Sequence, residues 1–199
     1  MNKIRNIKGT KDLLPEETFI WQKLENKIHH FNQKFGYKEI RTPIFEESSL
    51  FERGVGSETD IVNKEMYSWI DQGGNNLTLR PELTAPVTRA YIQHELGKSN
   101  PINKLYYIDS LFRRERPQKG RQRQFHQFGV EVFGSKFPEQ DSEIIIMAYK
   151  FLESLGLKNI SLEINTIGSK SIRNSYVTVL QNLLSKYKQD LSELDQLRL

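Results

Sequence analysis

Two pairs of strand-like segments, each joined by a polar connection, constrain the fold of this chain most strongly. Residues 66–71 and 77–80 flank the turn Gln72-Gly73-Gly74-Asn75, and residues 104–115 and 124–133 flank a basic segment. Segments joined in this way form antiparallel hairpins. A doubly wound parallel sheet needs regular alternation of strand and helix, which two hairpins interrupt. The pattern therefore predicts an α+β fold with a largely antiparallel sheet flanked by helices.

Helical periodicity recurs between and after the hairpins. From Ile20 to Phe35, apolar residues recur at spacings of three and four, and Gly36 stands where a left-handed cap would end a helix. Gly97 and Gly156 are expected to end two later helices in the same way. The predicted helices span residues 15–35, 82–96, 138–155 and 171–186.

Two further strands are expected at residues 37–45 and 160–166. Pro43 has no N–H group to donate to a neighbouring strand. The first of these strands is therefore expected at a sheet edge or at an interface between molecules.

Composition narrows the class of protein. Of the 199 residues, 37% are hydrophobic and 27% are charged, which is typical of a globular domain with a buried core. The longest purely apolar run, residues 144–148, is far too short to span a bilayer, and the basic N-terminus lacks the apolar stretch of a secretory signal. No cysteine is present, so disulfides are excluded, and we expect a cytoplasmic protein without membrane association.

The positive charge is concentrated in one place. Residues 113–123 hold six Lys or Arg and one Glu, a local charge of +5 against a net charge of +4 for the whole chain. The remainder is therefore close to neutral. Such a segment favours a phosphate-bearing partner, although a solvated charged loop is the simpler alternative.

The strand after the basic segment has an unusual face. Because side chains alternate along a strand, Phe125, Gln127, Gly129, Glu131 and Phe133 share one side. Glycine weakens a strand unless something must approach its backbone closely. A small polar ligand over the glycine, between the amide and the carboxylate, would explain the row, and a half-solvated strand remains the alternative.

The strand before the basic segment contributes to the same region. Arg113 and Glu115 share a face at the mouth of the hairpin. Arginine presents a forked donor suited to phosphate, glutamate accepts from an exocyclic amine such as that of adenine, and Phe125 offers a ring for stacking. Together these residues predict a nucleotide site beside an amino-acid-sized pocket.

The segment FRRERPQKGRQRQFHQFGVE closely resembles motif 2 of the class II aminoacyl-tRNA synthetases, in the form found in the histidyl-tRNA synthetase family. Three other stretches resemble that family in order and spacing. They are residues 8–15 (KGTKDLLP), residues 36–43, which resemble the motif 1 strand of the dimer interface, and residues 78–85 (TLRPELTA). The resemblance covers nearly the whole chain and implies the class II catalytic fold.

The resemblance also implies which residues bind ATP. Arg113 would bind the α-phosphate and stabilise charge there as the carboxylate of histidine displaces pyrophosphate, so it is the expected catalytic residue. Glu115 would contact the adenine amine, Phe125 would stack on the ring, and Arg121 would hold the γ-phosphate. ATP with Mg²⁺ enters as a substrate, and neither a tightly bound cofactor nor a protein metal site is implied.

A second set would bind histidine. Glu131 would bond the imidazole, and Glu82, Thr84 and Gln127 would contact the amino group. Leu83 departs from many bacterial relatives, which have glycine there, but eukaryotic forms also carry leucine. The expected histidine-binding residues are Glu82, Leu83, Thr84, Arg113, Gln127 and Glu131.

The resemblance implies that residues 1–199 are the N-terminal portion of the class II catalytic domain. Motifs 1 and 2 are present, whereas motif 3 and the anticodon-binding domain are absent. The chain alone is therefore expected to be weakly active or inactive. The implied partners are L-histidine, ATP, tRNA(His) and a second copy of the chain bound through the motif 1 strand.

Two other functions stay open. The first is the histidine-sensing regulatory paralogue of ATP phosphoribosyltransferase, which should lack the nucleotide-binding side of the hairpin. The second is a nucleic-acid-binding module that uses the basic loop, which would leave the row on residues 125–133 unexplained.

Several conspicuous residues have structural interpretations. The four histidines lack ligand spacing, so no metal site is predicted. His126 is expected to pack beneath the sheet, on the face opposite the predicted ligand. Gly54-Val55-Gly56 is too short for a phosphate-binding fingerprint and is interpreted as a turn.

Overall fold

The computed structural model describes residues 3–56, 59–166, 168–192 and 195–196, so the chain end at Leu199 lies outside the described part. The chain divides into two compact units, Met1–Ser154 and Leu155–Leu199. The second unit contains α6 (Lys170–Leu184) and the 3₁₀-helix η2 (Ser185–Asp190). All residues of the expected site belong to the first unit, which is therefore described in most detail.

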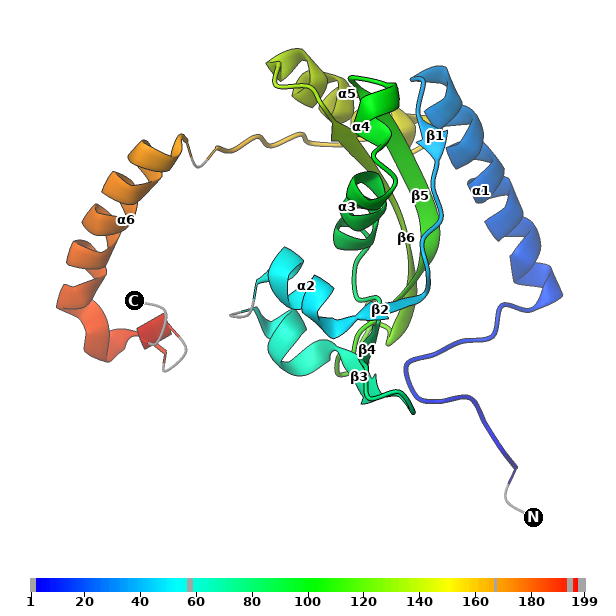
Figure 1. Ribbon diagram of the computed structural model, residues 1–199, viewed down its shortest axis with the longest axis horizontal. Helices are drawn as coiled ribbons and strands as arrows, with labels where there is room; N and C mark the ends of the chain where they lie inside the picture. Colours follow the sequence, from blue (N-terminus) through cyan, green and yellow to red (C-terminus); the bar gives the residue numbers. More distant parts are fainter. Residues whose placement is uncertain (1–2, 57–58, 167, 193–194, 197–199) are drawn as a thin grey trace. The chain divides into compact units, whose positions relative to one another are not determined.

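The first unit has the α+β composition that the two hairpins predict (Figure 1). Its strands form two three-stranded sheets, with the orders β1-β5-β6 and β2-β4-β3. A single-turn π-helix, η1, precedes the smaller hairpin. In chain order the elements are α1 (Pro15–Lys34), β1 (Lys38–Glu39), β2 (Phe45–Glu47), α2 (Ser48–Val55), η1 (Ile61–Glu65), β3 (Tyr67–Ile70), β4 (Asn76–Leu79), α3 (Thr84–Gln93), α4 (Leu96–Ser99), β5 (Asn103–Phe112), β6 (Gln124–Phe133) and α5 (Pro138–Ser154).

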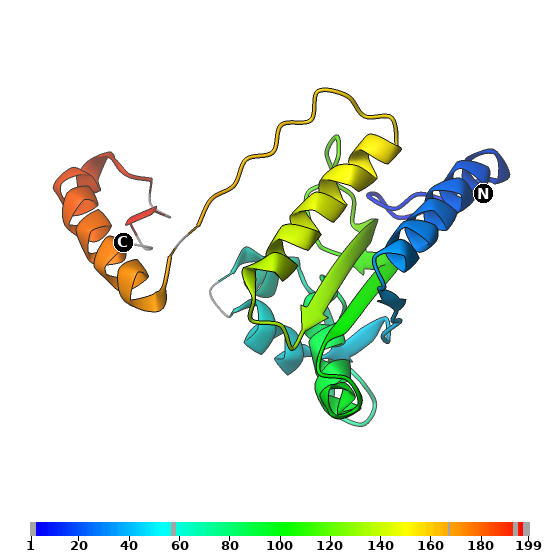
Figure 2. The same ribbon diagram turned by 90° about the horizontal axis from the view of Figure 1, so that it is seen from above.

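The β5–β6 hairpin is the centre of the unit, and the basic segment connects its strands. The antiparallel register runs without a bulge from the pair Asn103–Phe133 to the pair Phe112–Gln124. Helix α3 covers one face, and α1 and α5 cover the other (Figures 1 and 2). Both strands can be long because each face is covered by a helix.

Two hydrophobic clusters hold these helices against the hairpin. On the α3 face the buried residues are Leu83, Val87, Leu105, Tyr107 and Leu111. On the opposite face, Tyr37, Tyr106 and Met147 are buried among apolar residues of α1 and β6. Each fully buried side chain of this size contributes about 1.5–3 kcal/mol relative to exposure. The row expected to bind ligand thus lies on the face shared with α3.

The predicted strand at residues 37–45 is wrong as a single element. It divides into β1, which pairs in parallel with β5, and β2, which pairs with β4 in the other sheet. Between them the chain crosses from one sheet to the other, and Arg80 satisfies its carbonyl groups: Nη1 donates to the carbonyl of Thr42 at 2.9 Å, and the backbone N–H donates to that of Ile44 at 3.0 Å. The parallel β1 makes this sheet mixed. Each short strand lies at a sheet edge, as the proline at position 43 suggested.

Two other predictions of secondary structure were wrong. The helix expected over residues 82–96 ends at Gln93, and Gly97 lies inside α4, where a Cβ atom would be 2.4 Å from the hydroxyl of Tyr91. The strand expected at residues 160–166 is not formed, because no strand among the described residues pairs with it. A lone extended segment gains no hydrogen bonds from neighbours and is not stable as a strand.

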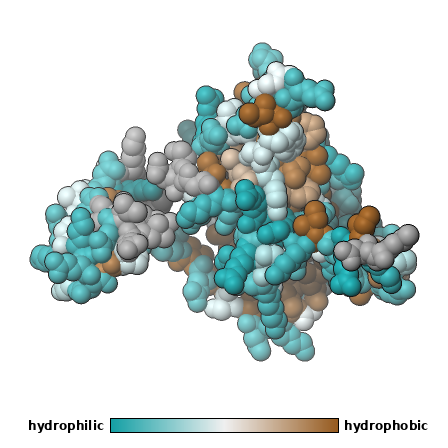
Figure 3. Space-filling view, turned by 90° about the horizontal axis from the view of Figure 1, so that it is seen from below, coloured by the Kyte–Doolittle hydropathy of each residue, from teal (hydrophilic) through white to brown (hydrophobic). Residues whose placement is uncertain are grey.

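One face of the molecule is largely polar. In Figure 3, hydrophilic residues predominate on the visible face and apolar residues form separate patches. Among the described residues, every helix is too short or too polar to traverse a bilayer. In the second unit, Ser169 caps the start of α6, and its hydroxyl accepts the N–H of Ile172.

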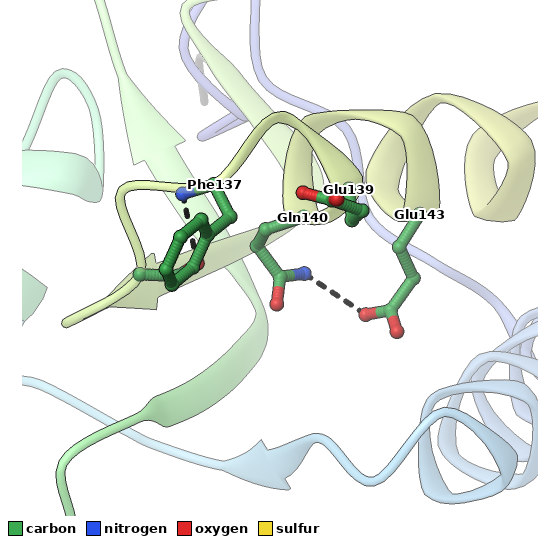
Figure 4. A pocket seen from close by; sticks show the side chains of 5 residues that line it. Phe137, Glu139, Gln140 and Glu143 are labelled. Atoms are coloured by element: carbon green, nitrogen blue, oxygen red, sulfur yellow. Dashed lines mark hydrogen bonds between the residues drawn. The ribbon is translucent and has the colours of Figure 1, made fainter.

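At the start of α5, Glu143 is the centre of a polar cluster (Figure 4). Its carboxylate accepts hydrogen bonds from Lys104 Nζ at 2.7 and 2.8 Å and from Gln140 Nε2 at 2.9 Å. Burial alone would raise its pKa, but these hydrogen bonds outweigh burial and hold the pKa of Glu143 below its ordinary value. Burial and the adjacent carboxylate raise the pKa of Tyr37 to about 12.

Glu143→Gln is expected to lower the free energy of unfolding by about 0.5–1 kcal/mol at neutral pH, since the pair with Lys104 is partly exposed. The pKa of Glu143 is lowered in the folded protein. The stabilisation is therefore complete above pH 4.5, the ordinary pKa of a glutamate, and is lost as the pH falls through the folded pKa. Urea unfolding at pH 7 and well below pH 4.5 measures the difference. Glu139→Gln, one turn earlier on α5, is the control and should change little at either pH. An equal loss at both pH values would contradict the ionic origin.

Candidate active site

The gap over Gly129 is filled by a side chain of the protein itself. Gly129 lies directly opposite Tyr107 in the hairpin register. A Cβ atom at position 129 would be 2.3 Å from the Tyr107 hydroxyl oxygen and 2.5 Å from Cζ, the ring carbon that bears it. The glycine is therefore required by the tyrosine ring, which occupies the place where the sequence suggested a ligand.

Glu131 and Thr84, expected to contact opposite ends of histidine, are hydrogen-bonded to each other. The Thr84 hydroxyl, at the start of α3, donates to Glu131 Oε1 at 2.7 Å. The Tyr107 hydroxyl donates to the same oxygen at 3.3 Å. The fold thus brings together residues 47 positions apart in sequence. The bond leaves the Thr84 hydroxyl and the second carboxylate oxygen of Glu131 able to accept hydrogen bonds from a ligand.

Glu82 and Leu83 already have structural roles. The carboxylate of Glu82 accepts the N–H groups of Thr84 at 2.6 Å and Ala85 at 3.0 Å, which stabilises the start of α3. Burial raises the pKa of Glu82, and the charge of Glu131 adds to the shift. The side chain of Leu83 is 1% exposed and packs in the core. Leu83 was expected to contact histidine; its side chain packs in the cluster that includes Tyr107, and the contact with histidine stays a prediction.

Gln127 differs from Glu131 in the same row because its side chain is not engaged by the described part of the protein. It lies opposite Asp109, whose carboxylate pairs with Arg80. Within the part of the chain that the structure describes, the Gln127 amide makes no side-chain hydrogen bond, although the residue is only partly exposed. An amide in this state can bind a polar ligand without first breaking a protein contact.

On the nucleotide side, Arg113 and Phe125 lie together. Arg113 Nε donates to the carbonyl of Pro81 at 2.9 Å, and its guanidinium carbon lies 5.2 Å from the centre of the Phe125 ring. Glu115 and Arg121 are paired with each other instead, at 3.2 Å. Strand β5 ends at Phe112, three residues before the predicted end at Glu115. All four residues expected to bind ATP are thus near the mouth of the hairpin, with two of them in an ion pair.

Backbone hydrogen bonds hold the basic connection between β5 and β6 to two other segments of the chain. The carbonyl of Gly9 accepts the N–H groups of Arg123 at 2.7 Å and Gln124 at 3.2 Å. The N–H of Arg114 donates to the carbonyl of Glu65 at 2.6 Å. The segment at residues 8–15 therefore supports the motif 2 connection directly, which its sequence alone does not indicate.

Gly9→Ala is expected to loosen this connection. Gly9 has φ +90°, and an added Cβ would be 2.8 Å from Arg123 Cγ and 2.9 Å from Pro117 Cγ. Hydrogen exchange at Arg123 and Gln124 should accelerate roughly 10-fold or more, because a left-handed conformation alone costs an L-residue about 1–2 kcal/mol. Gly36→Ala is the matched control, with φ +77° but open space around the Cβ. Equal exchange at these two amides in both variants would show that the contact is unimportant.

The sequence did not single out Tyr107 or Arg80. Tyr107 could have been identified by pairing the strands outward from the connection, which places an aromatic residue opposite a strand glycine. Arg80 is 2% exposed, yet an arginine before a proline gives no sign of burial in the sequence. Its Nε donates to the carbonyl of Ser110 at 2.9 Å, and its guanidinium forms an ion pair with Asp109.

Two minor predictions also need correction. His126 faces α1 as expected but is exposed, with its ring centre 4.5 Å from that of Trp21. Gly54 belongs to α2 and not to a turn, and a Cβ there would be 2.8 Å from Ala85 Cβ of α3, so the packing of the two helices explains the glycine. A pocket of about 610 Å³ lies between α2 and α3, and its lining includes Glu82 and Thr84. Within the described residues, no three His, Asp or Glu side chains gather in a way that would hold a metal ion.

Comparison with known proteins agrees with this arrangement. The profile of the histidyl-tRNA synthetase family matches residues 9–197. The histidine–tRNA ligase of Chloroherpeton thalassium is 49% identical over 197 residues, which are 98% of this chain and 46% of that protein. The chain therefore spans about half the length of the curated relatives that it matches.

Solved structures support the same assignment. The apo histidyl-tRNA synthetase of S. aureus matches with a TM-score of 0.78 and 37% identity, covering 98% of this chain and 46% of that one. An ATP phosphoribosyltransferase regulatory subunit/histidyl-tRNA synthetase from Bacillus halodurans matches with a TM-score of 0.67 and 27% identity, covering 79% and 40%. On the profile match, the close relatives and the shared fold, the chain belongs to the histidyl-tRNA synthetase family.

Proposed function

We propose that residues 1–199 form the N-terminal portion of a catalytic domain that activates L-histidine with ATP and transfers it to tRNA(His). The observation that carries this proposal is the row on β6, which joins two kinds of group on one face. Arg113 lies over Phe125 at one end, and Gln127 and Glu131 follow toward Thr84 at the other. The six-residue step from Phe125 to Glu131 spans about 20 Å of strand, long enough for an amino acid beside a nucleotide.

The proposed first step needs no nucleophile from the protein. A carboxylate oxygen of histidine attacks the α-phosphorus of ATP, a new P–O bond forms, and the bond to pyrophosphate breaks. Arg113 would stabilise the charge that develops at the α-phosphate, so positioning and electrostatics carry the rate. ATP would arrive as its Mg²⁺ complex, which is a substrate here.

The ion pair between Glu115 and Arg121 would open as ATP binds. The pair is 3.2 Å long, and Arg121 is 60% exposed, so the cost of separating them is small. Glu115 would then accept the adenine amine, and Arg121 would meet the γ-phosphate. The other basic residues of the connection would remain available for the phosphates of tRNA.

We also propose the partners and the location. Each of the edge strands β1 and β2, which replace the single predicted strand of motif 1, offers unpaired backbone groups to a second copy of the chain. Motif 3 and the anticodon-binding domain would belong to the half of the relatives that this chain does not cover. A cytoplasmic location suits this function.

The alternative is a regulatory, histidine-sensing protein, and the likeness to the Bacillus halodurans structure favours it as the second candidate. Such a protein would need the histidine side of the row but not the nucleotide side. In this chain Arg113 is held by Pro81 and Phe125, which argues for a working nucleotide site.

Isotope exchange between pyrophosphate and ATP separates the candidates. A full-length polypeptide that contains these residues should exchange pyrophosphate into ATP only when histidine is present. Histidine binding without exchange would support the regulatory protein. Binding of nucleic acid without either would support the third possibility, a general nucleic-acid module.

A further inference from the structure

Tyr107 lies at the meeting point of the proposed histidine-binding groups. It is 4% exposed, its ring covers Gly129, and its hydroxyl is 3.3 Å from Glu131 Oε1. The same oxygen accepts the Thr84 hydroxyl. The other oxygen of the carboxylate, Oε2, makes no hydrogen bond to the described residues.

The position of the ring is strongly constrained. It packs in the cluster formed by Leu83, Val87 and Leu105, so it has apolar neighbours on the α3 side. The backbone of Gly129 lies beneath it, where any side chain would collide. A ring held on both sides has little freedom to rotate, and its hydroxyl can reach only the polar end of the cluster.

We propose, on the basis of the proposed function, that Tyr107 is a positioning residue of the histidine site, which together with Thr84 holds Glu131 Oε1 and leaves Oε2 directed to the imidazole N–H of the substrate. A carboxylate held by two hydroxyl groups does not have to be ordered when the ligand binds. Tyr107 acts through Glu131 and does not itself touch the reacting atoms.

The electrostatics of the cluster support this role. Burial raises the pKa of Tyr107 well above its ordinary value, and the negative charge of Glu131 adds to the effect. The phenol therefore stays protonated at ordinary pH and acts as a donor to the carboxylate. Glu131 can then accept from an imidazole N–H through its other oxygen.

Tyr107→Phe tests the proposal, because it removes the hydroxyl and keeps the ring. In the full-length polypeptide, the Kd for histidine in calorimetry should rise roughly 10-fold, the lower end for a hydrogen bond to a charged group. The Kd for ATP and the melting temperature should stay nearly unchanged. Tyr106→Phe is the matched control: Tyr106 is equally buried but faces the opposite side, where its hydroxyl bonds His29 at 2.8 Å. It should leave histidine binding unaltered.

A double-mutant cycle shows whether the effect passes through Glu131. Glu131→Gln alone should weaken histidine binding and spare ATP binding. If Tyr107 acts through the carboxylate, adding Tyr107→Phe to Glu131→Gln should cause little further loss. Additive losses, or normal histidine affinity in Tyr107→Phe, would overturn the positioning role while leaving the proposed function intact. A parent protein that does not bind histidine would overturn both.

Discussion

Arg80→Met is expected to destabilise the fold by about 3 kcal/mol or more, the largest effect of any single change considered for this chain. The substitution keeps an unbranched side chain but removes every side-chain donor. It leaves the Asp109 carboxylate without its cationic partner. The carbonyl groups of Thr42 and Ser110 lose their hydrogen-bond donors. Breaking a buried ion pair from one side costs about 3–5 kcal/mol. The lower end applies, since the Asp109 side chain is 28% exposed.

Urea unfolding of the parent and the variant measures this loss. Arg41→Met is the matched control, because Arg41 also pairs with a carboxylate, Glu39 at 2.7 Å, but is 75% exposed. Its removal should change the free energy of unfolding little, because an exposed ion pair is screened by solvent. If the two variants lost similar stability, the junction of the sheets would not depend on Arg80.

Arg113→Lys is expected to slow adenylate formation on the order of 100-fold, by analogy with the loss of one oxyanion donor. Lysine keeps the charge but has no Nε group to donate to the carbonyl of Pro81 and no planar group to lie over Phe125. The positive charge at position 113 would no longer be fixed by contacts with Pro81 and Phe125. Single-turnover formation of the adenylate by the full-length polypeptide measures the rate.

Arg114→Lys is the control for that experiment. Arg114 is adjacent and exposed, and among the described residues its contact with the fold is the backbone N–H bond to the carbonyl of Glu65. Its replacement should leave the first step nearly unchanged. Near-normal adenylation by Arg113→Lys would remove Arg113 from the reaction and would leave the family membership untouched.

The two arginines are linked through the backbone. Arg80 is fixed by its side-chain bonds to both sheets, and the next residue, Pro81, supplies the carbonyl that holds Arg113. The carbonyl of Arg80 also accepts the N–H of Phe112 at 3.0 Å, at the end of β5. We therefore expect Arg80→Met to weaken ATP binding as well as stability. A buried residue with no contact to a ligand can in this way set the position of one that has such a contact.

Local chemistry in the sequence was sufficient for the hairpins and most of the helices. Alternation over residues 124–133 predicted β6 to the residue, and the spacing of apolar side chains with Gly36 predicted α1 within one residue of its end. The row from Phe125 to Glu131 and the charge of the connection were also readable. These features depend on residues close together in the chain, so a single sequence carries them.

The tertiary structure decided which distant groups meet. The sequence could not show that the segment at residues 37–45 crosses between two sheets, since a buried arginine from position 80 satisfies its carbonyls. It could not show that the glycine on β6 serves a tyrosine of the neighbouring strand, or that Thr84 bonds Glu131. Periodicity and propensity report which face a residue takes, whereas its partner depends on how elements far apart in sequence pack. In this protein the kinds of groups at the candidate site were determined locally, and their mutual contacts by the pairing of β5 with β6 and the docking of α3.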